Sequence, residues 1–80
     1  MDDSEKLIGV FALPYGREAI VKDVVFDSGM NLLRLTLKEG RRITIVDLDI
    51  PSVRQLAGTM LQWADNAADP ANPAPGDNRH

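Results

Sequence analysis

Three short glycine-containing breaks divide the first fifty residues into four runs rich in Val, Ile, Leu, Thr and Phe. The breaks are Pro14-Tyr15-Gly16-Arg17, Asp27-Ser28-Gly29 and Lys38-Glu39-Gly40. The runs between them cover about residues 6–13, 18–26, 30–37 and 41–48. Such runs bounded by turn residues are typical of strands, and connections this short join antiparallel neighbours. The sequence therefore predicts a four-stranded antiparallel meander.

A different period begins after residue 50. Apolar residues now recur on one side of a helix with 3.6 residues per turn. They are Val53, Leu56, Ala57, Met60, Leu61, Trp63, Ala64, Ala67 and Ala68. Pro51 suits the first helical position, whereas Ser52 and Gln55 have the spacing of a capping box and would start the helix slightly later. We expect an α+β fold of ββββα order, with this C-terminal amphipathic helix packed on one face of the sheet.

The composition changes again after residue 68. Residues 69–80 contain three prolines, a glycine and no large apolar side chain, so they cannot form a core. The sequence predicts a disordered Pro-rich tail over 69–80, a flexible N-terminus over 1–5 and a single β4α domain over 6–68.

Cysteine is absent from the 80 residues, and the one histidine, His80, lies in the predicted tail. Small domains are commonly stabilised by disulfides, by a structural metal or by a partner. Disulfides and thiolate zinc sites are excluded here, and we expect no cofactor. Association with another protein is the remaining way to add buried area.

The formal net charge is −3, and only Arg41 and Arg42 are adjacent among nine scattered basic residues. Because nucleic-acid binding relies on a basic patch, this pattern disfavours nucleic acid as a partner. The acidic start, Met1 to Lys6, precedes only a short apolar run, so we expect no secretory signal. No run approaches the roughly 18 apolar residues of a membrane span, and we expect a cytoplasmic protein with no membrane partner.

Turn chemistry predicts which side chains share a face of the sheet. Three-residue hairpin loops favour glycine in third place, as in Asp27-Ser28-Gly29 and Lys38-Glu39-Gly40. This pairs Leu35 with Val21 on one side and with Ile43 on the other. One face then collects Ala19, Val21, Leu33, Leu35, Leu37, Ile43 and Ile45, and we expect the helix to cover it. The opposite face collects Val24, Phe26, Met30, Leu32, Val46 and Leu48.

The second face is apolar enough to suggest an interface. If residues 14–17 form a four-residue loop, Leu7, Phe11 and Ile20 join it. Its polar members are Lys22, Arg34, Thr36 and Thr44. One helix covers one face only, and a large open apolar patch normally marks an interaction site. Two alternatives remain. In the first, the sheet curls around a single core. In the second, the register slips by one residue, which the position of Asp23 on the predicted core face favours.

Catalytic patterns are weak. Asp47-x-Asp49 offers two carboxylates to a cation, but carboxylates in front of a helix usually stabilise its positive end. No serine lies near a base in a familiar pattern, and His80 cannot be positioned as one. The sequence predicts no catalytic, metal or cofactor-binding residues, and we expect that the chain is not an enzyme.

Two functions follow as hypotheses. The first is a non-catalytic protein-interaction module, which homodimerises or docks on a larger subunit through Val24, Phe26, Met30, Leu32, Val46 and Leu48. The alternative is a small-ligand-binding regulatory domain with a pocket between helix and sheet, lined by Met60, Trp63 and Leu37. Tyr15, Arg17 and Trp63 are further candidates for contact with a partner.

Overall fold

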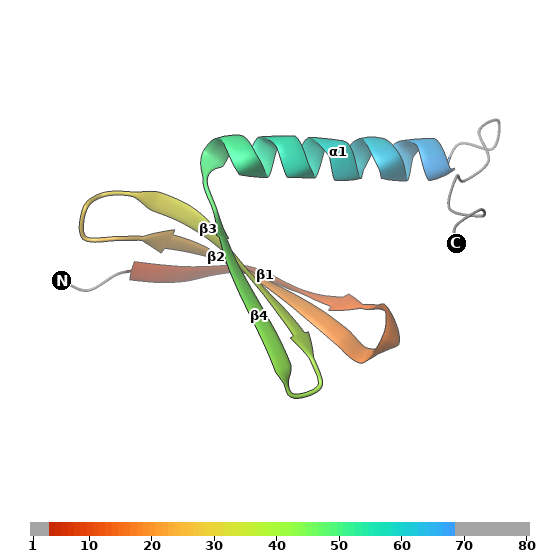
Figure 1. Cartoon of the computed structure of the whole chain (residues 1–80), viewed down its shortest axis with the longest axis horizontal. Helices are drawn as coiled ribbons and strands as arrows, with labels where there is room; N and C mark the ends of the chain where they lie inside the picture. The colour runs from red at the N-terminus through yellow and green to blue at the C-terminus, as the bar shows by residue number, and fades with distance from the viewer. Residues whose placement is uncertain (1–3, 69–80) are drawn as a thin grey trace. The chain divides into compact units, whose positions relative to one another are not determined.

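A computed structural model describes residues 4–68 of the chain (Figure 1). The elements in chain order are β1 (Ser4–Leu13), the 3₁₀ turn η1 (Pro14–Gly16), β2 (Arg17–Val25), β3 (Asn31–Glu39), β4 (Arg42–Leu48) and α1 (Ile50–Ala68). The prediction of a flexible segment over 1–5 is wrong for Ser4 and Glu5, which begin β1. The predicted tail over 69–80 lies outside the described residues.

The four strands form one antiparallel sheet in the order β1-β2-β3-β4, which confirms the predicted meander and the α+β class. The chain divides into two compact units, the sheet up to Ile50 and the helix from Pro51 onward. Helix α1 begins at Ile50, so Pro51 lies in its first turn and the later start at Ser52 is wrong. The packing of the helix on one face, and the single β4α domain, stay predictions.

The register between β2 and β3 is the predicted one, with Val21 opposite Leu35. Phe26 N–H donates to the Met30 carbonyl at 2.9 Å, and Gly29 N–H donates to the Phe26 carbonyl at 2.8 Å. Gly29 has a φ of 90°, the left-handed conformation that the third loop position requires. Turn chemistry therefore fixed this pairing correctly.

The predicted register between β3 and β4 is wrong. Leu35 lies opposite Val46 rather than Ile43, and Glu39 lies opposite Arg42. The loop is therefore the two residues Gly40-Arg41. Gly40 has a φ of 60°, which suits the first position of a type II′ hairpin turn. The pairing is displaced by three residues, and an odd displacement moves the side chains of β4 to the other face.

The loop between β1 and β2 also differs from the prediction. Leu13 lies opposite Arg17, so the loop has three residues, Pro14–Gly16, instead of four. Nearer the N-terminus of β1 the register shifts between Leu7 and Gly9, where one extra residue, Ile8, forms a β-bulge. As a result the side chains of β1 change faces at the bulge.

Candidate interaction surface

Ten apolar residues from all four strands share one face of the sheet, because residues paired across antiparallel strands point to the same side. We call it the apolar face. Its members are Phe11, Leu13, Ala19, Val21, Val25, Leu33, Leu35, Leu37, Val46 and Leu48. Five of them belong to the predicted core face, and five are additions from β1, β2 and β4.

The other side, which we call the mixed face, combines apolar and charged side chains. It carries Glu5, Leu7, Val10, Ala12, Glu18, Ile20, Lys22, Val24, Leu32, Arg34, Thr36, Lys38, Ile43, Ile45 and Asp47. The prediction that Ile43 and Ile45 belong to the core face is wrong, since the two-residue turn places them here. Leu7 and Ile20 share this face with Val24 as predicted, whereas Phe11 does not.

The six residues predicted as one interface do not lie on one surface. Val46 and Leu48 belong to the apolar face, whereas Val24 and Leu32 belong to the mixed face. Phe26 and Met30 close the hairpin between β2 and β3. Their grouping is therefore wrong, because it depended on the register of β4.

Burial separates these residues further. Within the described part of the chain the buried hydrophobic residues are Ala19 and Val24, and Val24 is only 1% exposed. Val24 is thus a packing residue with almost no surface accessible to a partner. On the apolar face Phe11 is 54%, Val46 41% and Leu37 38% exposed, and on the mixed face Ile43 and Ile45 are each 57% exposed.

The ring of Phe11 lies over Gly9, two residues before it on the same face of β1. A Cβ built at Gly9 would lie 2.8 Å from Phe11 Cζ and 2.9 Å from Cε2. The missing side chain therefore gives the ring a place against the backbone. Periodicity alone did not reveal this contact, although a glycine inside a strand is a known sign of a close approach.

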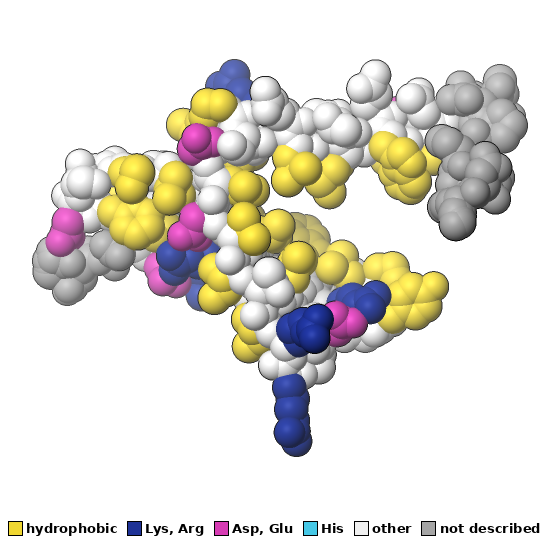
Figure 2. All heavy atoms as spheres, viewed as in Figure 1, with side chains coloured by type: hydrophobic (Ala, Val, Ile, Leu, Met, Phe, Trp, Pro, Cys, Tyr) yellow, Lys and Arg dark blue, Asp and Glu magenta, His cyan; other side chains and the backbone are white. Residues whose placement is uncertain are grey.

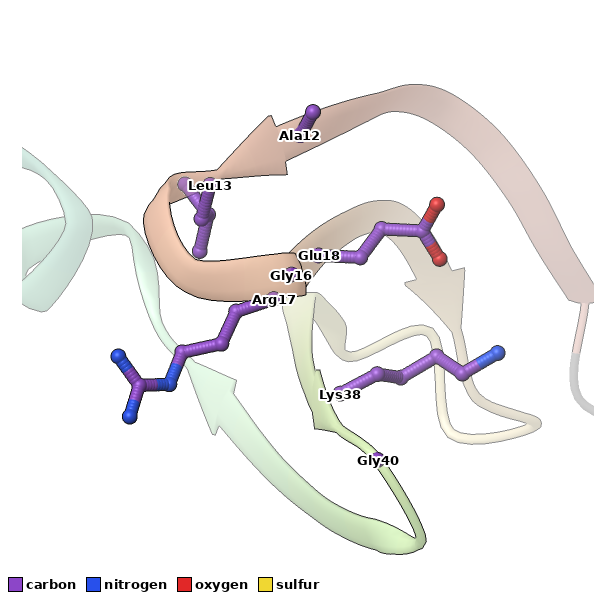
Figure 3. Close-up of a pocket in the computed structure, with 7 residues that line it drawn as sticks. All are labelled: Ala12, Leu13, Gly16, Arg17, Glu18, Lys38 and Gly40. Atoms are coloured by element: carbon purple, nitrogen blue, oxygen red, sulfur yellow. The ribbon is translucent and has the colours of Figure 1, made fainter.

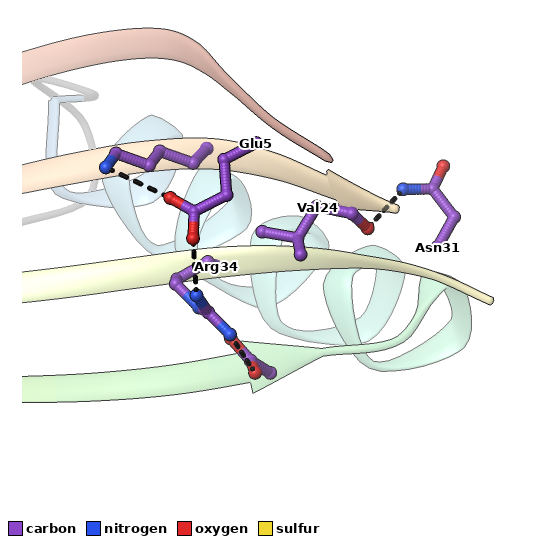
Figure 4. A network of polar contacts seen from close by, with 6 residues as sticks. Glu5, Val24, Asn31 and Arg34 are labelled. Carbon is purple, nitrogen blue, oxygen red and sulfur yellow. Dashed lines mark hydrogen bonds and ion pairs between the residues drawn. The ribbon is translucent and has the colours of Figure 1, made fainter. Parts of the chain in front are cut away.

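The mixed face holds a network of ion pairs in its interior (Figure 4). Arg34 Nε donates to Asp47 Oδ1 at 2.8 Å, and its Nη2 donates to Oδ2 at 3.0 Å. Glu5 accepts from Arg34 Nη1 at 3.0 Å and from Lys22 Nζ at 3.3 Å. The hydrogen bond from Arg34 holds the pKa of Asp47 below its usual value of 3.8.

This network also bears on the cation hypothesis for Asp47-x-Asp49. Both carboxylate oxygens of Asp47 accept from one guanidinium, the bidentate geometry that favours a stable ion pair. Among residues 4–68 no group of three or more Asp, Glu, His or Cys side chains could hold a metal ion.

Two of the three predicted partner contacts lie together at the β1–β2 turn. Tyr15 is almost fully exposed with a φ of 65°, and the Arg17 guanidinium lies 5.7 Å from the centre of its ring. Arg17 also donates to Glu39 Oε2 at 2.6 Å. Trp63 belongs to α1, where it is exposed together with Leu56, Met60 and Leu61.

A hollow of about 390 Å³ lies where the β1–β2 and β3–β4 hairpins adjoin (Figure 3). It is lined by Ala12, Leu13, Gly16, Arg17, Glu18, Lys38 and Gly40. A second, of about 310 Å³, is lined by Leu13, Arg17, Leu37, Lys38, Glu39, Arg42 and Thr44. Figure 3 shows Arg17 and Lys38 extending in opposite directions, so their charges do not converge on one ligand position. The ligand-binding alternative stays a prediction.

The fold and this surface define a small α+β domain with one sheet face whose two central rows carry no charge. The chain belongs to a family of unknown function (DUF6967), whose model matches residues 2–66. No curated protein and no solved structure matches it. In the described part of the chain, α1 falls short of the sustained apolar length that a membrane-spanning helix needs.

Proposed function

We propose that the chain is a non-catalytic protein-interaction module that self-associates, and that a second copy, in place of the helix expected from the sequence, covers the apolar face. The observation that carries the proposal is the continuity of this face across all four strands. Its cross-strand rows from Phe11 to Thr44 and from Gly9 to Val46 contain no charged residue. Phe11, Leu37 and Val46 nevertheless keep more than a third of their surface exposed.

The size of the face is compatible with the proposal. Four strands about 4.8 Å apart, with about five residues of apolar length from Leu33 to Leu37 at about 3.4 Å each, cover about 330 Å². Monomers normally leave no more than a few hundred Å² of contiguous apolar surface exposed. With the rows at both ends the whole sheet face covers about 590 Å², compared with the roughly 800 Å² that each partner contributes to a stable interface.

A second copy suits this face because two apolar faces can cover each other. Two twisted sheets pack face to face with their strands within about 30° of each other, and their side chains interdigitate. Such an interface is isologous, so one apolar face serves both subunits. A chain of this length without cysteine cannot be stabilised by a disulfide. Pairing would stabilise it by adding buried area.

The test is the mass in solution, measured by size exclusion with light scattering over a dilution series. We expect twice the 8.8 kDa of one chain. Val46→Lys should give monomer, because it places a charge in one of the two uncharged rows of the apolar face. Ile45→Lys is the matched control, since Ile45 is the preceding residue, is 57% exposed and points to the mixed face.

Circular dichroism should show that both variants fold. A wild-type chain that is monomeric at every concentration would overturn the proposal. So would two variants that dissociate equally, because the apolar face would then have no special part in the association.

A further inference from the structure

Helix α1 carries a second apolar surface. At about 100° per residue its apolar side chains fill an arc of roughly 160°, and Figure 2 shows hydrophobic side chains gathered along one side of α1. We call this surface the apolar stripe, and its large members are Val53, Leu56, Met60, Leu61 and Trp63. The last four of these are exposed in the single chain. If a second copy covers the apolar face of the sheet, that face cannot also cover the stripe.

The area of the proposed interface favours including the stripe. The whole sheet face, at about 590 Å², is about 200 Å² smaller than the roughly 800 Å² that each partner contributes to a stable interface. A helix of 19 residues is about 28 Å long and about 10 Å wide, so one side of it covers up to about 280 Å². The face and the stripe together therefore reach the area of a stable dimer, whereas the face alone does not.

The charged residues of α1 indicate the direction in which two stripes pair. They are Arg54 and Asp65, and both are exposed. Their separation of eleven residues corresponds to about 20° around the helix and about 17 Å along its axis. Both therefore border the stripe on the side of Leu61, one toward each end of the helix.

A two-fold axis can relate two paired helices in two ways. If the axis runs along the helices, they are parallel, and each charge lies at the level of its own kind. If the axis runs across them, they are antiparallel, and Arg54 of each copy lies beside Asp65 of the other. The same register places Leu56 beside Trp63 of the other copy at the opposite border of the stripe, because both pairs have their midpoint next to Met60. Charge and apolar packing therefore favour one register.

We propose that the apolar stripes of two copies pair antiparallel within the same dimer, with Arg54 of each helix beside Asp65 of the other. This inference rests on the proposed function, because it adds the helices to the dimer formed by the apolar faces. One two-fold axis then relates both the sheets and the helices. The occupant of the stripe is the helix of the second copy, rather than a different protein or the sheet of the same chain.

The first experiment follows the fluorescence of Trp63, the single tryptophan of the chain. Quenching by acrylamide is measured over the same dilution series as the mass. Because Trp63 is 59% exposed in the single chain, pairing of the helices should reduce its quenching at least about twofold as the dimer forms. In the Val46→Lys monomer the quenching should stay high at every concentration.

The second experiment exchanges the two charges of the helix and measures the dissociation constant by sedimentation equilibrium at low salt. Arg54→Glu alone or Asp65→Arg alone should weaken the dimer about fivefold, because each places like charges side by side twice in the dimer. Both substitutions together should restore it. Gln62→Glu is the control, since Gln62 lies on the side of the helix away from the stripe. Each single substitution suits the helix dipole, so neither should weaken the helix itself.

The outcomes separate this inference from the proposed function. A quenching of Trp63 that is the same in dimer and monomer overturns the pairing of the helices and leaves self-association through the apolar face in place. Single charge variants with unchanged affinity overturn the antiparallel register. A mass of four chains also overturns the inference, because the helices would then join separate dimers. A wild-type monomer at every concentration overturns both proposals. A dimer that protects Trp63 and regains its affinity in the double variant supports the inference.

Discussion

The two faces of the sheet are built from alternating residues of the same four strands, yet they differ in where their charges lie. On the mixed face Lys22, Arg34 and Asp47 occupy one row in the interior, joined by Glu5. On the apolar face charges occur only toward the ends. Desolvating an ion-pair network is costly, whereas covering apolar side chains is favourable. The position of charge, rather than apolar content, therefore distinguishes the two faces.

The largest difference between the faces should appear at two neighbouring residues of β3. Leu35→Ala removes a half-buried side chain from the centre of the apolar face and should lower the free energy of unfolding by about 2–3 kcal/mol. Thr36→Ala, on the mixed face, should change it by no more than about 0.5 kcal/mol. Chemical denaturation at one fixed protein concentration measures both, and equal losses would remove the distinction between the faces.

A smaller effect should follow from breaking the network of the mixed face. Arg34→Met leaves Asp47 and Glu5 without the guanidinium and should lower the free energy of unfolding by about 1 kcal/mol, since the pairs are partly exposed. The loss should shrink in high salt. Lys38→Met is the control on the same face. A loss that does not depend on salt would indicate that Arg34 acts through packing alone.

The contact between Gly9 and Phe11 sharpens the picture of the apolar face. Alanine is normally better than glycine in a strand, but here a Cβ would meet the ring at 2.8 Å. Gly9→Ala should therefore destabilise the chain by about 1 kcal/mol, and the cost should disappear in a Phe11→Leu background. A double-mutant cycle measures the coupling, and additive effects would show that the ring moves away freely.

The smallest effect concerns pH. Because Arg34 lowers the pKa of Asp47 in the folded chain, the ionised carboxylate stabilises the fold. This contribution is fully present above the usual value of 3.8 and is lost as the pH falls through the lower folded pKa. Asp47→Asn should make the free energy of unfolding less dependent on pH below about pH 5. An unchanged acid limb in denaturation experiments would contradict this role.

The number of strands, their order and the helix could be predicted because runs, breaks and periodicity are local properties. The β2–β3 register followed correctly from Asp27-Ser28-Gly29. The β3–β4 register did not, because Lys38-Glu39-Gly40-Arg41 fits two hairpins. Glycine suits the third position of a three-residue loop and also the first position of a two-residue type II′ turn.

The wrong loop length predicted between β3 and β4 also made the predicted interface wrong. Val46 and Leu48 moved to the face opposite Val24 and Leu32, which divided the predicted interface. The position of Phe11 was lost for a related reason, since the loop at 14–16 is one residue shorter than expected and the bulge in β1 has no clear sequence signal. Side-chain networks such as Arg34 with Asp47 depend on these registers, so they could not be predicted first.

Because of the bulge, β1 can lose one residue at Ile8 without a change in the pairing of its other residues. Ile8 is the extra residue between Leu7, which lies opposite Lys22, and Gly9, which lies opposite Val21. Removing Ile8 would leave a regular ladder with every other pairing unchanged. Removing a residue elsewhere in the strand would move the side chains on one side of the deletion to the opposite face of the sheet. We therefore expect members of this family to gain or lose a residue in β1 at this position while keeping both faces intact.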